Sequence, residues 1–447
     1  MGKKICFQIF ISIIFLGLSF IVEGQNDNAS FDRLTIMDGI SQSSVNCILQ
    51  DKKGFIWLGT RDGLNKFDGY TFKSFKNEPD NPASISNNEI ISLCQDTSGL
   101  LWIGTRGGGL NIYDPHSESF IRFQNRQNDP GSLKSNVVLS IFIDSKNNTW
   151  IGTTNALYKA IRKNTKDSVI NLSFVNVSKD VKVYLVPSFS VRNINESRNG
   201  NLLISTESGI YLFNTLTYHF KELGIPNVND YFFTCSYQQS DNILWLGTFD
   251  AGILKVIFER NEESRVAKIE RFDRSIAGFN HLNHNRVDAL LADRFNNLWI
   301  ATRGGLVRLN LNTNTKSVFT SDPFDERSIS DNKLNSLFVD RTGVLWIGTE
   351  SQGVNKYDLY KKKFYHFKSI PGNANSLSNN VVSAIYGGQK DIIWVGTDGG
   401  GIDKIDFSNI NSPQFTHYKN NPNTPGSLLS DNILSLYQDK QNTLWVG

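Results

Sequence analysis

Three consecutive glycines, Gly107 to Gly109 in the stretch LWIGTRGGGL, are the first residues that could do chemistry. A glycine-rich turn after a short apolar run lets backbone N–H groups approach a phosphate closely, as in nucleotide-binding loops. Such loops continue into Gly-Lys-Ser or Gly-Lys-Thr, which does not follow here. Similar glycines recur along the chain as RDG, RGG, ESG, DAG, SQG and DGGG. Because a nucleotide site would not repeat in this way, we predict strand-to-strand turns.

Histidine and aspartate side chains could instead hold a metal ion. His281 and His284 are the only close pair among the six histidines, and they lack an acidic partner at zinc-ligand spacing. Aspartates followed three residues later by Gly or Asn recur, without the alternating ligands of a calcium loop. We therefore predict a polar loop at the histidines and turn caps at the aspartates. We expect no metal, no cofactor and no catalytic residue.

The tryptophans reveal an internal repeat. All eight are followed by an aliphatic residue and then Gly or Ala, and a ninth copy, LLISTESGI, has leucine in the Trp position. The mean spacing of these anchors is about 48 residues, which is typical of solenoids, propellers and arrays. The nine anchors are Trp57, Trp102, Trp150, Leu203, Trp245, Trp299, Trp346, Trp394 and Trp445.

Each repeat predicts four short strands. The residue three before an anchor is always Gly, Asn or Asp, and the residue six before it is Asp in six copies, which together suit a tight turn. Strand A precedes this turn, strand B contains the anchor, and an alternating strand C and an aromatic strand D follow. Small residues lie ten before most anchors, where they would fit a narrow central channel: Cys47, Ser92, Ser140, Cys235, Ala289, Ser336, Ala384 and Ser435. This pattern predicts an all-β fold of four-stranded β-propeller blades.

Nine repeats exceed the usual four to eight blades of one ring, so we expect a tandem propeller. The run FDRLT at 31–35 resembles a D strand, and it could complete the blade of Trp346 and close a seven-bladed ring. An eight-bladed ring stays open as an alternative. We predict a first propeller over 25–360 and the incomplete start of a second over 361–447, opened by a strand at 363–369. Since Gly447 falls within a strand B, the second ring is expected to continue.

The N-terminus has the pattern of a secretory signal over residues 1–24. Lys3 and Lys4 precede an apolar run from 9 to 22, and small residues precede Gln25. An uncleaved anchor is the alternative, although the run is short for a membrane span. The net charge of +3 gives no electrostatic footprint for nucleic acid. The three remaining cysteines lie in apolar runs, so we expect buried thiols rather than disulfides.

The pattern in DKKGFIWLGTRDGL and DRTGVLWIGTESQGV resembles the two-component regulator propeller repeat, over nearly all of residues 31–447. The departures are Leu203, Ser205 and a missing glycine at 154–157. The resemblance implies the periplasmic sensor region of a hybrid two-component histidine kinase, commonly built as two seven-bladed propellers, a β-sandwich, a membrane helix and kinase and phosphorelay domains. It also implies an oligosaccharide ligand, a homodimer formed through the full-length protein, and membrane attachment only through a C-terminal part.

Candidate ligand-binding residues lie where the repeat departs from its own pattern. The residue fourteen before an anchor is Asn in five repeats, but two repeats have Phe189 and Tyr231 there, and Phe232 follows. Phe249 comes four after its anchor, where other repeats have an arginine: Arg61, Arg106 and Arg303. Aromatic rings offer flat apolar faces to sugars and arginines bind acidic groups, so these residues are the predicted saccharide contacts. The structural alternative is that the aromatics fill space left by the missing Trp.

These observations favour a non-catalytic, ligand-sensing region. Two other classes stay open. A secreted propeller enzyme acting on polysaccharides would need a cluster of carboxylates at one channel mouth. A protein-binding scaffold would use the propeller rim and lack a kinase. Fold alone does not separate these classes, because propellers carry many functions.

Overall fold

The computed structural model describes residues 29–163, 170–178, 189–197, 199–226, 231–259, 265–273, 285–360, 367–388, 391–409 and 413–447. The segment expected to be a signal, the pair His281 and His284, and most of the strand expected at 363–369 lie outside these ranges. The chain divides into two compact units, Met1–Tyr360 and Lys361–Gly447. Among the described residues, no helix is long and apolar enough to cross a membrane.

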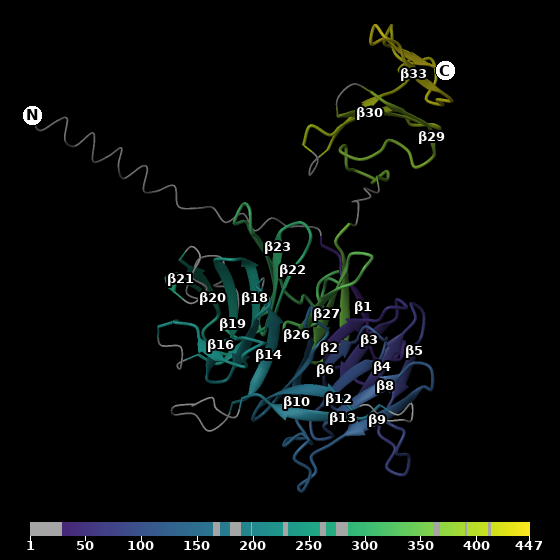
Figure 1. Ribbon diagram of the computed structural model, residues 1–447. Coiled ribbons are helices and arrows are strands. Elements are labelled where there is room, and N and C mark those ends of the chain that lie inside the picture. Colours follow the sequence, from purple (N-terminus) through teal and green to yellow (C-terminus); the bar gives the residue numbers. More distant parts are fainter. Residues whose placement is uncertain are drawn as a thin grey trace, which may run out of the picture. The chain divides into compact units, whose positions relative to one another are not determined.

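The first unit consists of seven four-stranded antiparallel sheets, one for each of its anchors (Figure 1). Blades one and two contain β2 (Val45–Gln50), β3 (Ile56–Thr60), β4 (Gly63–Phe67), β5 (Phe72–Phe75), β6 (Ile90–Gln95), β7 (Leu101–Thr105), β8 (Leu110–Asp114) and β9 (Ser119–Phe123). Blades three and four contain β10 (Val138–Ile143), β11 (Thr149–Thr153), β12 (Leu157–Arg162), β13 (Leu172–Asn176), β14 (Val191–Glu196), β15 (Leu202–Thr206), β16 (Gly209–Phe213) and β17 (Phe220–Glu222).

Blades five and six contain β18 (Phe233–Ser240), β19 (Ile243–Thr248), β20 (Ile253–Phe258), β21 (Val266–Phe272), β22 (Val287–Ala292), β23 (Asn297–Thr302), β24 (Gly305–Asn310) and β25 (Lys316–Phe319). Blade seven contains β26 (Leu334–Val339), β27 (Val344–Thr349), β28 (Val354–Asp358) and the N-terminal strand β1 (Asp32–Leu34). A 3-10 turn, η1 (Ile36–Asp38), connects β1 to blade one. The first strand of each blade contacts the first strand of the next around the centre of the unit.

The N-terminal strand closes the ring, which confirms the seven-bladed prediction. Strand β1 pairs antiparallel with β28, with Asp32 opposite Lys356 and Leu34 opposite Val354. Phe31 is buried beside Phe319 and Tyr357, with ring centroids 5.5 and 5.2 Å away. Strands β2 and β26 also contact each other, so the first and last blades are neighbours. Strand β1 thus supplies the outermost strand of blade seven and covers the edge of β28 that would otherwise lack a partner.

The second unit contains one complete blade and part of another. Strands β29 (Val382–Gly387), β30 (Ile392–Thr397), β31 (Gly401–Asp406) and β32 (Gln414–Tyr418) form a four-stranded sheet. Strands β33 (Leu436–Gln438) and β34 (Leu444–Val446) form a two-stranded sheet. Of the strand expected at 363–369, only residues 367–369 are described, and they are not in a strand.

The recurring turns have the predicted backbone. The residue three before the anchor has positive φ in eight repeats, including Asn147 at 62° and Asn296 at 59°; Asn242 is the exception. Gly107 and Gly109 also have positive φ, at 116° and 76°, in the turn between β7 and β8. A Cβ on Gly109 would lie 2.4 Å from the Phe123 carbonyl oxygen, so glycine is required there for packing as well. The glycine triplet therefore serves the turn.

In six repeats, the aspartate before the turn does more than cap it. One oxygen of Asp51 accepts the backbone N–H groups of Lys53 and Phe55 at 2.9 and 3.0 Å. The other accepts the indole N–H of Trp57 at 2.8 Å. The same indole bond, at 2.8–3.0 Å, occurs in five further repeats, to Asp96, Asp144, Asp293, Asp340 and Asp439. Because a buried indole N–H is costly to leave without an acceptor, the aspartate and tryptophan form one structural unit.

The Asp340 carboxyl should make the fold acid-sensitive. Burial by itself raises the pKa of Asp340, but hydrogen bonds from Thr342, Trp346 and the Val344 N–H hold it below the ordinary 3.8. The folded state therefore binds this proton less readily than the unfolded state. The stability that results is present above pH 3.8 and is lost as the pH falls through the lowered pKa. We expect the free energy of unfolding, measured with urea, to fall less between pH 7 and about pH 3 in Asp340→Asn than in the unmodified protein. An unchanged pH dependence would contradict this role.

The three cysteines of the described residues are free thiols, of which Cys235 is buried and Cys47 and Cys94 are half-buried. Burial raises the pKa of Cys47 and of Cys235 to about 12, and that of Cys94 to about 11. Thiolate is the reactive form, so these side chains should be protonated and inert at neutral pH. We expect iodoacetamide to leave Cys47 and Cys235 unmodified in the folded protein and to label both after unfolding, as read by mass spectrometry. Equal labelling in both states would contradict the packing.

Candidate functional site

Each innermost strand of the first unit contains a β-bulge at the same position of the repeat. The register shifts around the residue that lies eleven before the anchor, between Val45 and Cys47 in blade one, for example. A bulged residue leaves the hydrogen-bonded ladder and its side chain is redirected. The seven bulged residues are Asn46, Ile91, Leu139, Arg192, Thr234, Asp288 and Asn335. All seven line a single cavity of about 420 Å³.

The residues predicted to face the channel lie one position further along and do not line this cavity. They pack between their own strand B and the next blade. A Cβ on Gly59 would lie 2.5 Å from the Cys47 sulfur and 2.7 Å from Ile90 of blade two. In blade three, Ser140 Oγ donates to the Val191 carbonyl oxygen of blade four at 3.1 Å. These residues are small because neighbouring blades approach closely, so the channel prediction was wrong by one position.

The rest of the cavity wall comes from turns between the second and third strands and from residues just before the innermost strands. The turns contribute Arg61, Arg106, Phe249 and Arg303. The segments before β6, β18 and β22 contribute Glu89, Phe232 and Arg286. The cavity is thus at the end of the ring where these turns converge, and we call it the channel mouth.

Two phenylalanines stack on each other in the channel mouth. The rings of Phe232 and Phe249 are stacked, with centroids 5.2 Å apart and planes 9° apart. Arg192 lies over the Phe232 ring at 5.1 Å, and Arg286 lies over the Phe249 ring at 4.6 Å. Phe249 is 38% exposed, so part of its ring is open to solvent in the mouth.

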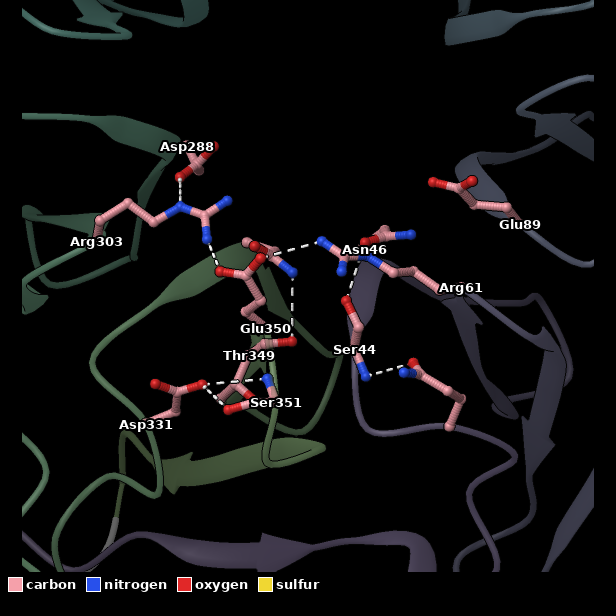
Figure 2. Close-up of polar contacts among 12 residues, drawn as sticks. Ser44, Asn46, Arg61, Glu89, Asp288, Arg303, Asp331, Thr349, Glu350 and Ser351 are labelled. Carbon is pink, nitrogen blue, oxygen red and sulfur yellow. Dashed lines mark hydrogen bonds and ion pairs between the residues drawn. The ribbon is translucent and has the colours of Figure 1, made fainter.

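Charged side chains form a network around these rings (Figure 2). Arg61 and Arg303 both bond to the Glu350 carboxylate, Arg61 at 3.0 Å. Arg303 also bonds to Asp288 at 3.2 Å, and Asp288 is 2.7 Å from Arg286. Burial lowers the pKa of the Arg303 guanidinium, and repulsion from Arg286 and Arg61 adds to this, while Asp288 opposes it. The network therefore concentrates positive charge in a partly dehydrated place.

Two further ion pairs extend the network around the mouth. Arg106 is 2.7 Å from Glu89, and Arg192 bonds to Glu207. Both pairs join a turn to an innermost strand or the residue before it. Sequence reasoning identified Arg61, Arg106 and Arg303 from their repeated position but missed Arg192, Arg286, Asp288, Glu89 and Glu350. The available signal was the variety of residue types eleven before the anchor, beside a neighbouring position that is small in most repeats.

Of the seven predicted ligand contacts, five lie at the channel mouth: Phe232, Phe249, Arg61, Arg106 and Arg303. Phe189 is only 6% exposed and packs against Tyr211 and Phe220. Tyr231 packs on Phe233 and a buried apolar cluster. For these two, the space-filling interpretation fits the structure.

The asparagines that Phe189 and Tyr231 replace hold a loop. In blades where this asparagine occurs, its side-chain oxygen accepts a backbone N–H from the preceding link, as Asn88 does from Asn77 at 2.6 Å. Asn136 and Asn332 do the same at 2.7 Å. Within the described ranges, no group of three or more His, Cys, Asp and Glu side chains could hold a metal ion.

A model of the two component regulator propeller family matches seven segments of the chain, residues 39–62, 84–107, 132–155, 281–304, 328–351, 376–399 and 427–447. The chain belongs to this family. The propeller repeats of Leu203 and Trp245, in blades four and five, are not among the matched segments. Those two blades provide Arg192, Phe232 and Phe249, so the aromatic part of the mouth comes from the blades that depart from the family pattern.

Solved structures similar to this propeller chain include two extracellular domains. The domain of the hybrid two component system BT3049 from B. thetaiotaomicron is 27% identical, with a TM-score of 0.62 over 94% of this chain and 52% of that one. The domain of BT4673 from the same organism is 19% identical, with a TM-score of 0.57 over 94% and 51%. The chain thus spans about half the length of either domain.

Two other relatives give narrower information. Histidine kinase P4 of Formosa agariphila is 53% identical over 78 residues, which are 17% of this chain and 6% of that protein. Virginiamycin B lyase from Staphylococcus aureus is 14% identical, with a TM-score of 0.51 over 74% of this chain and 99% of the lyase. The lyase shows a shared propeller fold only.

Proposed function

We propose that this chain is the extracytoplasmic ligand-binding region of a hybrid two-component sensor histidine kinase, and that its ligand is a glycan bound at the channel mouth. The observation that carries the proposal is the stacked pair Phe232 and Phe249, with Phe249 38% exposed, in a cavity of about 420 Å³ lined by arginines. Sugar rings bury their apolar faces on aromatic rings, and the surrounding hydrogen-bond donors fix their hydroxyl groups.

The family and its solved members support a sensing role. The two extracellular domains of hybrid two component systems match nearly the whole of this chain. A short segment is 53% identical to a histidine kinase. An export signal over residues 1–24 would place the region outside the cytoplasm. Kinase domains, a membrane helix and a dimer would then belong to the full-length protein.

The charged groups of the mouth suit binding better than catalysis. Hydrolysis of a glycosidic bond uses two carboxyl groups that flank the bond, one of them a proton donor. Here Glu89, Asp288 and Glu350 each bond to at least one arginine. All three carboxylates are thus occupied by ion pairs with arginines, and none stands as one of two carboxyl groups that flank a substrate position.

Signalling would follow from differential binding to two arrangements of the full-length protein. A glycan that binds one arrangement more tightly shifts the population toward it and so changes kinase activity. The test uses the full-length gene and a transcriptional reporter, with neutral and acidic plant and algal oligosaccharides as inducers. We expect one structural class of glycan to activate the reporter and to bind the purified exported region. A full-length gene without a membrane helix and kinase, or activation by no glycan that binds, would overturn the proposal.

A further inference from the structure

The wall of the channel mouth has an excess of positive charge. It contains five arginines, Arg61, Arg106, Arg192, Arg286 and Arg303, and the carboxylates that pair with them are Glu89, Glu207, Asp288 and Glu350, which leaves one net positive charge. Two of these arginines share Asp288, and two share Glu350, which lies next to the wall. Several guanidinium groups held close together repel one another, and a neutral saccharide would not reduce that repulsion. The composition therefore points to a ligand with its own negative charge.

Glu350 shows where such a charge would fit. It lies in the turn between β27 and β28 of blade seven, and its carboxylate is held between Arg61 of blade one and Arg303 of blade six. Figure 2 shows the two guanidinium groups reaching this carboxylate from opposite sides. Arg61 is half exposed, so at least one side of the position is open to solvent. A planar carboxylate or a sulfate between two guanidiniums is a strong, charge-assisted arrangement.

The aromatic pair lies along the same wall. Arg286 covers the Phe249 ring at 4.6 Å and is 2.7 Å from Asp288, which is 3.2 Å from Arg303. One ligand could therefore place a ring against Phe249 and an anionic group at Arg303.

We propose that the channel mouth recognises a saccharide that carries a carboxylate or sulfate group, and that this group displaces the Glu350 carboxylate from Arg61 and Arg303. The inference rests on the proposed function for the saccharide and on this charge network for the anion. Displacement would release the contact that joins blades six, seven and one, and blade seven is the blade that β1 closes. Ligand binding would thus act directly on the ring closure.

The test compares matched ligands on the exported chain by calorimetry at low salt. The probes are trigalacturonate with its methyl ester, and a sulfated disaccharide with its desulfated form. We expect one anionic probe to bind about tenfold or more tightly than its neutral counterpart, with affinity that falls as salt is added. If no anionic probe binds more tightly than its counterpart, the proposal is overturned. This comparison needs no variant and does not depend on the folding of one.

Variants test the displacement. Glu350→Gln removes the competing charge and should tighten binding of the anionic probe by about threefold to tenfold, whereas Arg303→Gln should weaken it by about tenfold. The control is Glu118→Gln, which breaks an exposed pair with Lys73 outside the mouth. Weaker binding by Glu350→Gln in a protein of unchanged melting temperature would overturn displacement. If neutral and anionic glycans bound equally tightly, the sensing proposal would stand and the anionic-ligand proposal would fall. If the anionic probe bound but no reporter responded, the anionic-ligand proposal would stand and the sensing proposal would fall.

Discussion

Replacing Trp299 with leucine will lower the free energy of unfolding of the first unit by about 3 kcal/mol, as measured by urea denaturation. Trp299 is 0% exposed, packs between blades six and seven, and donates its indole N–H to Asp293 at 2.8 Å. The substitution leaves a cavity and also removes one of the two donors to an oxygen of the buried Asp293 carboxylate, which keeps only Asn297. Both losses act in the same direction.

Blade four supplies the matched control for this prediction. There the anchor is Leu203, and Ser197 occupies the position six before it. Adding Asp293→Ser to Trp299→Leu copies that pair into blade six and removes the buried charge. We expect the double variant to be more stable than the sum of the two single effects predicts, by about 1 kcal/mol. Strictly additive effects would mean that the aspartate acts only on the turn.

Replacing Phe249 with alanine will weaken glycan binding by about tenfold or more without lowering the melting temperature. Phe249 is 38% exposed and supports the mouth by stacking on Phe232 at 5.2 Å, so its removal takes away ligand contact and little core packing. Aromatic side chains at the centre of a binding site commonly contribute 2 kcal/mol or more, roughly thirtyfold in affinity. Calorimetry with the inducing glycan and a thermal melt check the two halves of this expectation.

Phe189 provides the opposite case. It was also predicted as a ligand contact, from a different position of the repeat, but it is buried against Tyr211 and Phe220. Phe189→Leu should lower the melting temperature and leave the dissociation constant of the glycan unchanged. If both variants lost affinity equally, or if Phe249→Ala bound normally, the channel mouth would not be the glycan site.

Much of the fold could be predicted from the sequence because the repeat displays its own constraints many times. The tryptophan spacing gave the blade length, and the glycine and asparagine turns gave the strand boundaries. The FDRLT run predicted ring closure by β1, since a strand without partners in blade one must pair elsewhere. Each of these features depends on neighbours in the sequence or on a period.

The site was harder to predict because its geometry depends on a bulge. The bulge moves one residue of each innermost strand out of the ladder, so the side chains at the mouth come from the position beside the one with the clearest pattern. Alternation along a strand predicts opposite faces and contains no sign of this shift. Glu350 was missed for another reason: it contacts Arg61 only because the ring closes, across 289 residues of sequence.

The central claim is that a glycan binds at the channel mouth of the first unit. The most direct measurement is a crystal structure of the first unit with a glycan that binds it in calorimetry. We predict a sugar ring against Phe249 and polar or charged groups of the ligand bonded to Arg61 or Arg303. A ligand bound elsewhere, with the mouth unchanged and Glu350 still between the two arginines, would contradict the account.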